Sequence, residues 1–296
     1  MITPGWPSYR ANKTYNPTVM NPNCPASEPI VSKTPTRLQS YDMDTPVGKL
    51  HVWHQPTFTQ STGNPLTSGR PVMLLVHGWG GWAEAMGELV EKLAPSFPDW
   101  SFVAITLPEI SKSSGKGPTP HHFSQQSVTQ VRQTIDYLSR QPGQPQLYVL
   151  GYSLGAPITV HALAQLQTQT RQKPTKLLLL APAFDFSPSL NKTLLDQDHQ
   201  PDSGFPLAWM DWNHNDQLRP YLRESVDLLR RGLNPIDRCI FISPNDTAVS
   251  LPAVQQSLRQ RSELSLISSG SHESIDNPEL VQNMTQWLQN QAVKPV

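Results

Sequence analysis

The sequence predicts an α/β fold in which helices cover both faces of a mostly parallel central sheet. Two observations carry this prediction. Short, continuous apolar runs such as residues 72–76 and 177–181 are typical of strands buried on both faces. Segments with apolar residues at helical spacing, such as residues 123–140, alternate with these runs. Because each strand is separated from the next by a helix, neighbouring strands are expected to run in parallel.

The predicted elements begin with an antiparallel hairpin at one edge of the sheet. Residues 38–43 and 49–54 form its strands, on either side of the turn sequence Thr-Pro-Val-Gly. The later strands are expected at residues 72–76, 102–107, 147–150, 177–181, 238–242 and 264–267. The helices are expected at residues 82–93, 123–140, 154–166, 217–231, 252–261 and 278–289. Trp82 begins the apolar face of the first helix and is expected in the core.

Length and composition are consistent with one large domain preceded by an irregular arm. The chain has 296 residues, of which 37% are hydrophobic and 30 are proline. Residues 1–36 are rich in Pro, Asn, Ser and Thr without apolar periodicity, so we expect an irregular arm there. The α/β domain is expected over residues 37–296, with a long insertion lacking strand signals between the strands at 177–181 and 238–242.

Charge and targeting signals exclude several functional classes. The formal net charge is +0, so no general electrostatic attraction to nucleic acid or to an anionic membrane is expected. The apolar runs are too short for a transmembrane segment, and the N-terminus has no pattern of a secretory signal. Cys24 and Cys239 do not resemble a disulfide framework. These features predict a cytoplasmic protein; they leave its oligomeric state open.

The central motif is Gly151-Tyr152-Ser153-Leu154-Gly155, directly after the strand predicted at residues 147–150. A G-x-S-x-G sequence permits a sharp strand-to-helix turn, in which the serine takes a strained backbone angle and its Oγ is presented above the sheet. Ser153 is therefore the candidate nucleophile. An ordinary Gly/Ser turn is the alternative interpretation of the motif alone.

Two later strand ends supply the groups that a nucleophilic serine needs. Asp246 follows the strand at 238–242, and His272 follows the strand at 264–267. Since the carboxyl ends of parallel strands meet at one edge, both side chains are expected near Ser153, with His272 as the base and Asp246 as its orienting carboxylate. A turn aspartate and a surface histidine are the alternatives. Asp185, after the strand at 177–181, is the rival for the carboxylate.

The negative charge that develops on an attacked carbonyl oxygen requires hydrogen-bond donors. We expect the backbone N–H groups of Leu154 and of Trp79 to supply them. Trp79 belongs to the sequence His-Gly-Trp-Gly-Gly at residues 77–81, in which His77 is expected to fix the loop. No metal site is predicted: His121 and His122 lack partners at ligand spacing, and His161 is expected to pack within a helix. No cofactor motif is present in the sequence.

These motifs together resemble those of serine-type α/β-hydrolases, including esterases, lipases and thioesterases. The resemblance covers about residues 37–291 and consists of residues 77–81, the G-x-S-x-G at 151–155, Asp246 and His272 in the family order. It implies the family fold, with a helical cap inserted after the sixth strand at about residues 183–237. The glycine-rich turn that many relatives carry after the strand at 102–107 is replaced here by Leu-Pro-Glu-Ile-Ser-Lys-Ser, which implies a remodelled loop.

The function predicted is hydrolysis of a carboxylic ester through an acyl-enzyme on Ser153. The substrate would be a small-molecule acyl ester or thioester, with no cofactor and no nucleic acid. The apolar acyl pocket is expected to be lined by Phe205, Trp209, Met210 and Trp212 of the insertion. A thioesterase or acyltransferase using the same site, and a non-catalytic binding protein on the same fold, are the alternatives.

Overall fold

The computed structural model describes residues 38–55, 65–78, 81–107, 123–167, 176–185, 218–233, 236–258, 260, 263–268, 272 and 275–292. All of them belong to the unit that extends from Thr36 to Val296. The irregular arm predicted over residues 1–36 therefore lies outside the described residues and stays a prediction.

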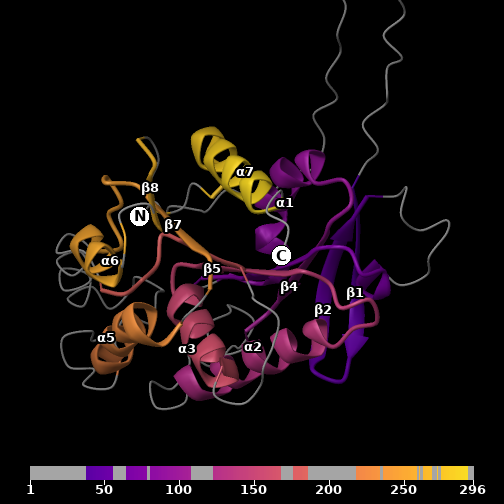
Figure 1. Cartoon of the computed structure of the whole chain (residues 1–296), viewed down its shortest axis with the longest axis horizontal. Coiled ribbons are helices and arrows are strands. Elements are labelled where there is room, and N and C mark those ends of the chain that lie inside the picture. Colours follow the sequence, from indigo (N-terminus) through magenta and orange to yellow (C-terminus); the bar gives the residue numbers. More distant parts are fainter. Residues whose placement is uncertain are drawn as a thin grey trace, which may run out of the picture. The chain divides into compact units, whose positions relative to one another are not determined.

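An eight-stranded sheet forms the centre of this unit (Figure 1), with the strand order β1-β2-β4-β3-β5-β6-β7-β8. Strands β1 (Gln39–Thr45) and β2 (Gly48–His54) form the predicted antiparallel hairpin, and β2 pairs antiparallel with β4. The other strands are parallel to one another: β3 (Val72–Val76), β4 (Ser101–Ile105), β5 (Leu147–Tyr152), β6 (Lys176–Leu180), β7 (Arg238–Ile242) and β8 (Leu264–Leu266). The predicted fold class is confirmed.

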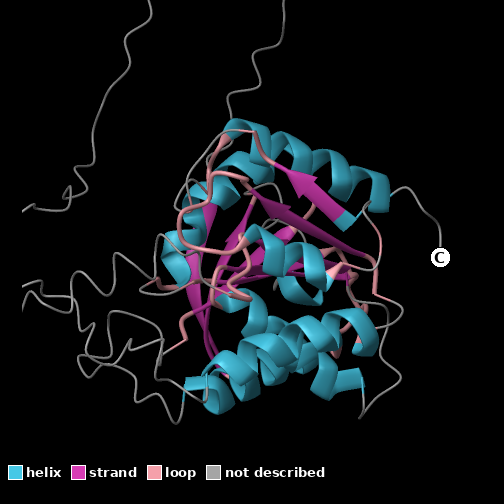
Figure 2. Ribbon diagram, turned by 90° about the vertical axis from the view of Figure 1, so that its left-hand side faces the viewer, coloured by secondary structure: helices cyan, strands magenta, loops and turns pink. Residues whose placement is uncertain are grey.

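Helices cover both faces of the sheet, as Figures 1 and 2 show. One face carries α1 (Gly87–Leu93) and α7 (Pro278–Ala292). The opposite face carries α2 (Phe123–Ser139), α3 (Gly155–Gln167), α5 (Leu218–Asp227) and α6 (Leu251–Ser257). The described residues also form the 3-10 turns η2 (Pro65–Thr67), η3 (Ala83–Met86) and η4 (Ala94–Ser96). Within the described part of the chain, no helix combines the length and the hydrophobicity needed to cross a membrane.

Strand β3 illustrates how the two layers of core arise from one apolar run. Leu74 belongs to the core under α2 and α3, whereas Met73 and Leu75 belong to the core under α1 and α7. All three side chains are fully buried. Successive side chains of a strand point to opposite faces, so an uninterrupted apolar run is needed where both faces are covered.

The first helix differs from its prediction. It begins as the 3-10 turn η3 at Ala83, and Trp82, expected in the core, is 44% exposed. Trp82 is the residue before the turn and has an extended backbone, with φ −149° and ψ 174°, so its side chain does not continue the apolar face. Ala83 and Met86 occupy the core instead.

The insertion after the sixth strand is helical over residues 218–232. It contains α5 and a π-helical turn, η7 (Leu228–Gly232), in place of the single helix predicted over residues 217–231. Arg238, the first residue of β7, is buried; its guanidinium donates to the carbonyl oxygen of Leu229 and pairs with the Glu263 carboxylate at 2.9 Å. These bonds connect the end of the insertion to the sheet.

Candidate active site

Ser153 lies at a tight turn between β5 and α3, with a backbone φ of +51°. Left-handed backbone is unusual for a residue with a side chain and costs about 1–3 kcal/mol, so surrounding bonds must enforce it. The Ser153 N–H donates to the Leu180 carbonyl at 2.9 Å, and the Ser153 carbonyl accepts from the Ala156 N–H at 3.1 Å and the Ala183 N–H at 3.1 Å. The end of β6 and the residues after it, through Leu180 and Ala183, and the start of α3, through Ala156, therefore hold the turn predicted from G-x-S-x-G.

Close approach of three backbones explains the glycines around this turn. A Cβ atom on Gly155 would lie 2.4 Å from the carbonyl oxygens of Val76 and His77, at the end of β3. A Cβ atom on Gly78 would lie 2.8 Å from the Ser153 Cβ. Both distances are shorter than non-bonded carbon contacts allow, so a side chain at either position would push the loop after β3 away from the serine.

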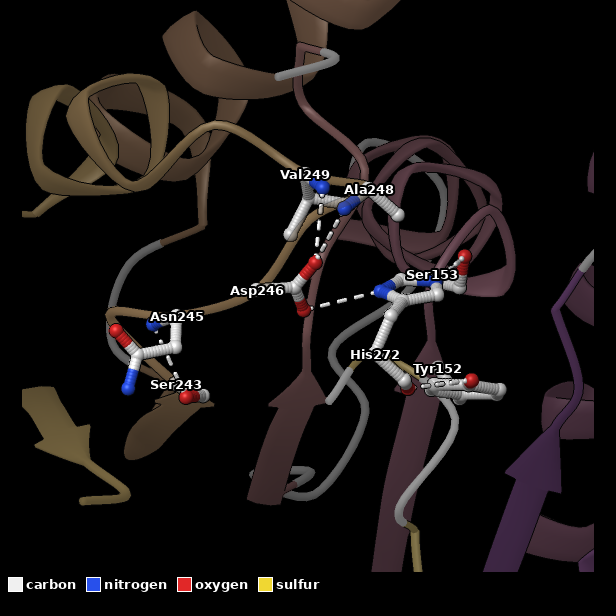
Figure 3. Close-up of polar contacts among 8 residues, drawn as sticks. All are labelled: Tyr152, Ser153, Ser243, Asn245, Asp246, Ala248, Val249 and His272. Carbon is white, nitrogen blue, oxygen red and sulfur yellow. Dashed lines mark hydrogen bonds and ion pairs between the residues drawn. The ribbon is translucent and has the colours of Figure 1, made fainter. Parts of the chain in front are cut away.

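His272 connects Ser153 to Asp246 through its two ring nitrogens (Figure 3). Its Nε2 lies 2.9 Å from the Ser153 Oγ, and its Nδ1 lies 3.0 Å from the Asp246 Oδ2. The Asp246 side chain is only 2% exposed and the His272 side chain 16%. The structure thus brings together the three side chains that the sequence predicted, from loops after β5, β7 and β8.

Asp246 divides its two carboxylate oxygens between a turn and the imidazole. Oδ1 accepts from the N–H groups of Ala248 at 2.8 Å and Val249 at 3.0 Å, while Oδ2 faces His272. Asp246 therefore makes the contacts of a turn aspartate and also contacts the imidazole; its role as the orienting carboxylate stays a prediction. The rival Asp185 is exposed, and its carbonyl oxygen accepts from the Ser250 N–H at 2.9 Å.

The loop that carries His272 is fixed at both of its described ends. Ser268, just after β8, donates its N–H and its hydroxyl to the Glu279 carboxylate, at 3.0 and 2.6 Å. Asn277 caps α7 by accepting the N–H of Glu279 at 2.9 Å. Glu279 was not predicted from the sequence. Its signal there is a glutamate in the first turn of a helix directly after a candidate catalytic loop.

The candidate oxyanion donors are only partly described. Leu154 follows Ser153 directly and precedes α3, so its backbone lies beside the candidate nucleophile at the positive end of a 13-residue helix. Its side chain is buried in the core. Trp79 lies outside the described residues, and so do Phe205, Trp209, Met210 and Trp212 of the predicted acyl pocket. Both assignments stay predictions.

His77 holds the loop after β3, as expected, and is in the neutral form. Its Nδ1 donates to the Gly78 carbonyl at 2.7 Å, and its Nε2 accepts from the Leu107 N–H at 2.9 Å. A protonated ring would direct a second N–H at that donor. Burial of this side chain lowers the pKa of His77 from its ordinary value of 6.5 to about 4.

This buried imidazole predicts acid lability. Above pH 6.5 His77 is neutral in both the folded and the unfolded chain, and the folded state has its full stability with respect to this group. As the pH falls from 6.5 towards 4, the unfolded chain binds a proton at His77 that the folded chain does not bind. The difference between the two pKa values corresponds to about 3 kcal/mol, so the free energy of unfolding should fall by about that amount. Burial lowers the pKa of His161 as well, which acts in the same direction.

Urea denaturation at pH 7.5, 6, 5 and 4 measures this dependence. His77→Asn removes the titrating group, so the variant should lose less free energy over the range than the wild type. Parallel pH dependences of the two proteins would contradict the assignment.

Among the described residues, Asp42, His51 and Glu84 place potential metal ligands within 4.8 Å of one another. The His51 Nδ1 lies 2.6 Å from the Asp42 Oδ1, and the Lys49 Nζ lies 3.6 Å from the Asp42 Oδ2. These contacts at the β1–β2 hairpin occupy Asp42 and His51, and we assign the cluster no chemical role.

Comparison with known families agrees with this fold. Residues 64–269 match the family described as "Alpha/beta hydrolase of unknown function (DUF900)". The chain belongs to this family. No curated protein matches this α/β-hydrolase.

Many solved structures share the fold at low sequence identity. An esterase/lipase from an uncultured bacterium has a TM-score of 0.58 and 15% identity, covering 87% of this chain and 86% of that one. The 2-hydroxy-6-oxo-6-phenylhexa-2,4-dienoate hydrolase from Rhodococcus sp. strain RHA1 has a TM-score of 0.54 and 16% identity, covering 87% and 100%. A lipase-esterase related protein from Clostridium acetobutylicum has a TM-score of 0.53 and 17% identity, covering 81% and 98%. At these identities the similarity establishes the α/β-hydrolase fold alone.

Proposed function

We propose that this α/β-hydrolase cleaves a carboxylic ester through an acyl-enzyme on Ser153. The observation that carries the proposal is the continuous hydrogen-bond chain from the Ser153 Oγ through His272 to Asp246, at 2.9 and 3.0 Å. The esterase and lipase names of the structural relatives favour an ester as the bond that is cleaved. The substrate is a small-molecule acyl ester, with the predicted acyl pocket formed by the insertion.

The geometry supports a two-step acyl transfer. The Ser153 Oγ attacks the carbonyl carbon while His272 Nε2 takes the hydroxyl proton, and the carbonyl oxygen becomes negative. The N–H groups of Leu154 and Trp79 stabilise that charge. The carbon–oxygen bond then breaks, and the leaving alcohol takes the proton from His272. Water then attacks the acyl-serine while His272 Nε2 takes a proton from it. The bond between the acyl carbon and the Ser153 Oγ breaks, Oγ takes the proton back from His272, and the carboxylic acid is released.

Asp246 keeps the imidazole in the productive tautomer. Its Oδ2 accepts the Nδ1–H, which leaves the Nε2 lone pair directed at the serine hydroxyl. The same carboxylate stabilises the imidazolium that exists between the two proton transfers.

Labelling with a fluorophosphonate probe tests the nucleophile. The wild type should react at Ser153, whereas Ser153→Ala should lose both labelling and ester turnover, by about 10⁶-fold in kcat. Ser139→Ala is the matched control, because it removes a serine hydroxyl at the end of α2, where Ser139 donates to the Asp136 carbonyl at 2.9 Å. A wild-type protein that stays unlabelled would identify a binding module instead.

The chemical class of the substrate requires a second measurement. A panel of p-nitrophenyl esters of graded acyl length, assayed beside acyl-CoA thioesters, should give Ser153-dependent hydrolysis of the oxygen esters. Preference for the thioesters, or transfer of the acyl group to an added alcohol or amine, would replace esterase by thioesterase or acyltransferase.

A further inference from the structure

Tyr152, the residue before the candidate nucleophile, contacts the candidate base in two ways (Figure 3). Its hydroxyl donates to the backbone carbonyl oxygen of His272 at 2.8 Å. Its ring stacks on the imidazole, with the centroids 5.5 Å apart and the planes 29° from parallel. The first contact fixes the position of the His272 backbone, and the second limits the orientation of its ring.

The same ring also lies against the loop after β3. A Cβ atom on Gly78 would come within 3.2 Å of the Tyr152 Cδ1, so the ring occupies the space that the missing side chain leaves. Tyr152 thus adjoins the backbone next to the predicted oxyanion donor, the backbone of Ser153 and the ring of His272.

The place of Tyr152 in the sheet makes it a rigid support. It is the last residue of β5, which pairs with β3 on one side and with β6 on the other. His272, by contrast, comes from a loop 119 residues further along the chain than Ser153. The tyrosine connects that distant loop to the strand from which the serine projects.

We propose that Tyr152 is a positioning residue that sets the distance between His272 Nε2 and Ser153 Oγ. The inference rests on the proposed function and adds a role to a residue of the motif that the general G-x-S-x-G pattern leaves undefined. The hydroxyl restrains where the imidazole starts, and the ring face restrains its plane. The ring face also favours the imidazolium that forms during acyl transfer, because an aromatic face attracts a cation.

Two substitutions separate the contributions of the hydroxyl and of the ring. Tyr152→Phe keeps the stacked ring and removes the bond to the His272 carbonyl, and it should lower kcat about 10-fold. Tyr152→Leu removes both contacts and should lower kcat about 10²-fold. In both variants KM should change less than about twofold, because Tyr152 acts on His272 and not on the bound substrate.

Tyr148→Phe is the matched control, since Tyr148 lies on the same strand four residues earlier and its ring packs against Trp100 instead, with the centroids 4.3 Å apart. It should leave both kinetic constants unchanged. Thermal unfolding of all three variants shows whether the fold persists. Unchanged kcat in Tyr152→Phe and Tyr152→Leu, or a loss of kcat in Tyr152→Leu matched by an equal loss of folded protein, would overturn the proposal.

A spectroscopic readout keeps this proposal separate from the proposed function. The Nδ1–H proton of His272, shared with Asp246, should give a low-field NMR signal that disappears in Asp246→Asn. In Tyr152→Leu the signal should broaden or shift, since the ring no longer holds one orientation. If the wild type hydrolyses no ester, the proposed function fails, but this signal still tests the positioning role; an identical signal in Tyr152→Leu would refute it.

Discussion

Replacing His272 by alanine should lower kcat for ester hydrolysis by about 10⁴- to 10⁶-fold, with the fold intact. Among the described residues, the His272 imidazole is the group placed to accept the Ser153 hydroxyl proton, with its Nε2 at 2.9 Å from the Oγ. Without it the hydroxyl has to attack as a neutral alcohol. Since His272 is partly exposed and its ring is not part of the core, unfolding measurements should show little change.

His51→Ala is the control for this variant. His51 lies on the β1–β2 hairpin and pairs with Asp42, so its loss should leave kcat unaltered. Added imidazole should restore part of the activity of His272→Ala by entering the space that the ring vacates. Full activity of His272→Ala on every ester tested would remove this residue from the mechanism.

Asp246→Asn should lower kcat by about 10⁴-fold. The amide keeps the shape of the carboxylate, but its NH₂ group can donate to the His272 Nδ1. The proton then moves to Nε2, where it blocks acceptance of the serine proton. The Asn oxygen can still accept from Ala248 and Val249, which bond Oδ1 in the wild type, so the turn should persist.

Asp185→Asn provides the comparison that decides between the two carboxylates. Asp185 is exposed, and its bond to Ser250 uses the backbone carbonyl, which the substitution does not alter. We expect kcat within about twofold of the wild type, inside the range of an ordinary surface substitution. A loss at Asp185 with normal activity at Asp246 would reverse the assignment.

The fold was predictable from the sequence because its central strands are buried on both faces. The strands Val72–Val76 and Arg238–Ile242 have the predicted bounds. In the first of them, an uninterrupted apolar stretch of five residues leaves few alternatives to a buried strand. Strand β6 was displaced by one residue, because Ala181 takes a φ of +43° and leaves the strand. The predicted helix over residues 252–261 ends at Ser257, where Leu258 becomes extended.

The site was predictable only to the level of its motif residues. Ser153, Asp246 and His272 follow strands whose carboxyl ends share one edge, which chain order and topology together imply. The roles of Tyr152 and Glu279 depend on contacts between residues that are distant in the sequence. Tyr152 contacts His272, 120 residues later, and Glu279 contacts Ser268, 11 residues earlier. Local periodicity carries no signal for such contacts, and their catalytic meaning stays a prediction.

The tight fit between α3 and the end of β3 sets a rule for redesigning this enzyme. A Cβ atom placed on Gly155 would lie only 2.4 Å from the carbonyl oxygens of Val76 and His77. Position 155 therefore has to remain glycine in every variant library. Gly78 carries the same restriction through Ser153. Substitutions aimed at a new substrate specificity should therefore be made in segments that do not border this junction, while the residues of the junction are kept.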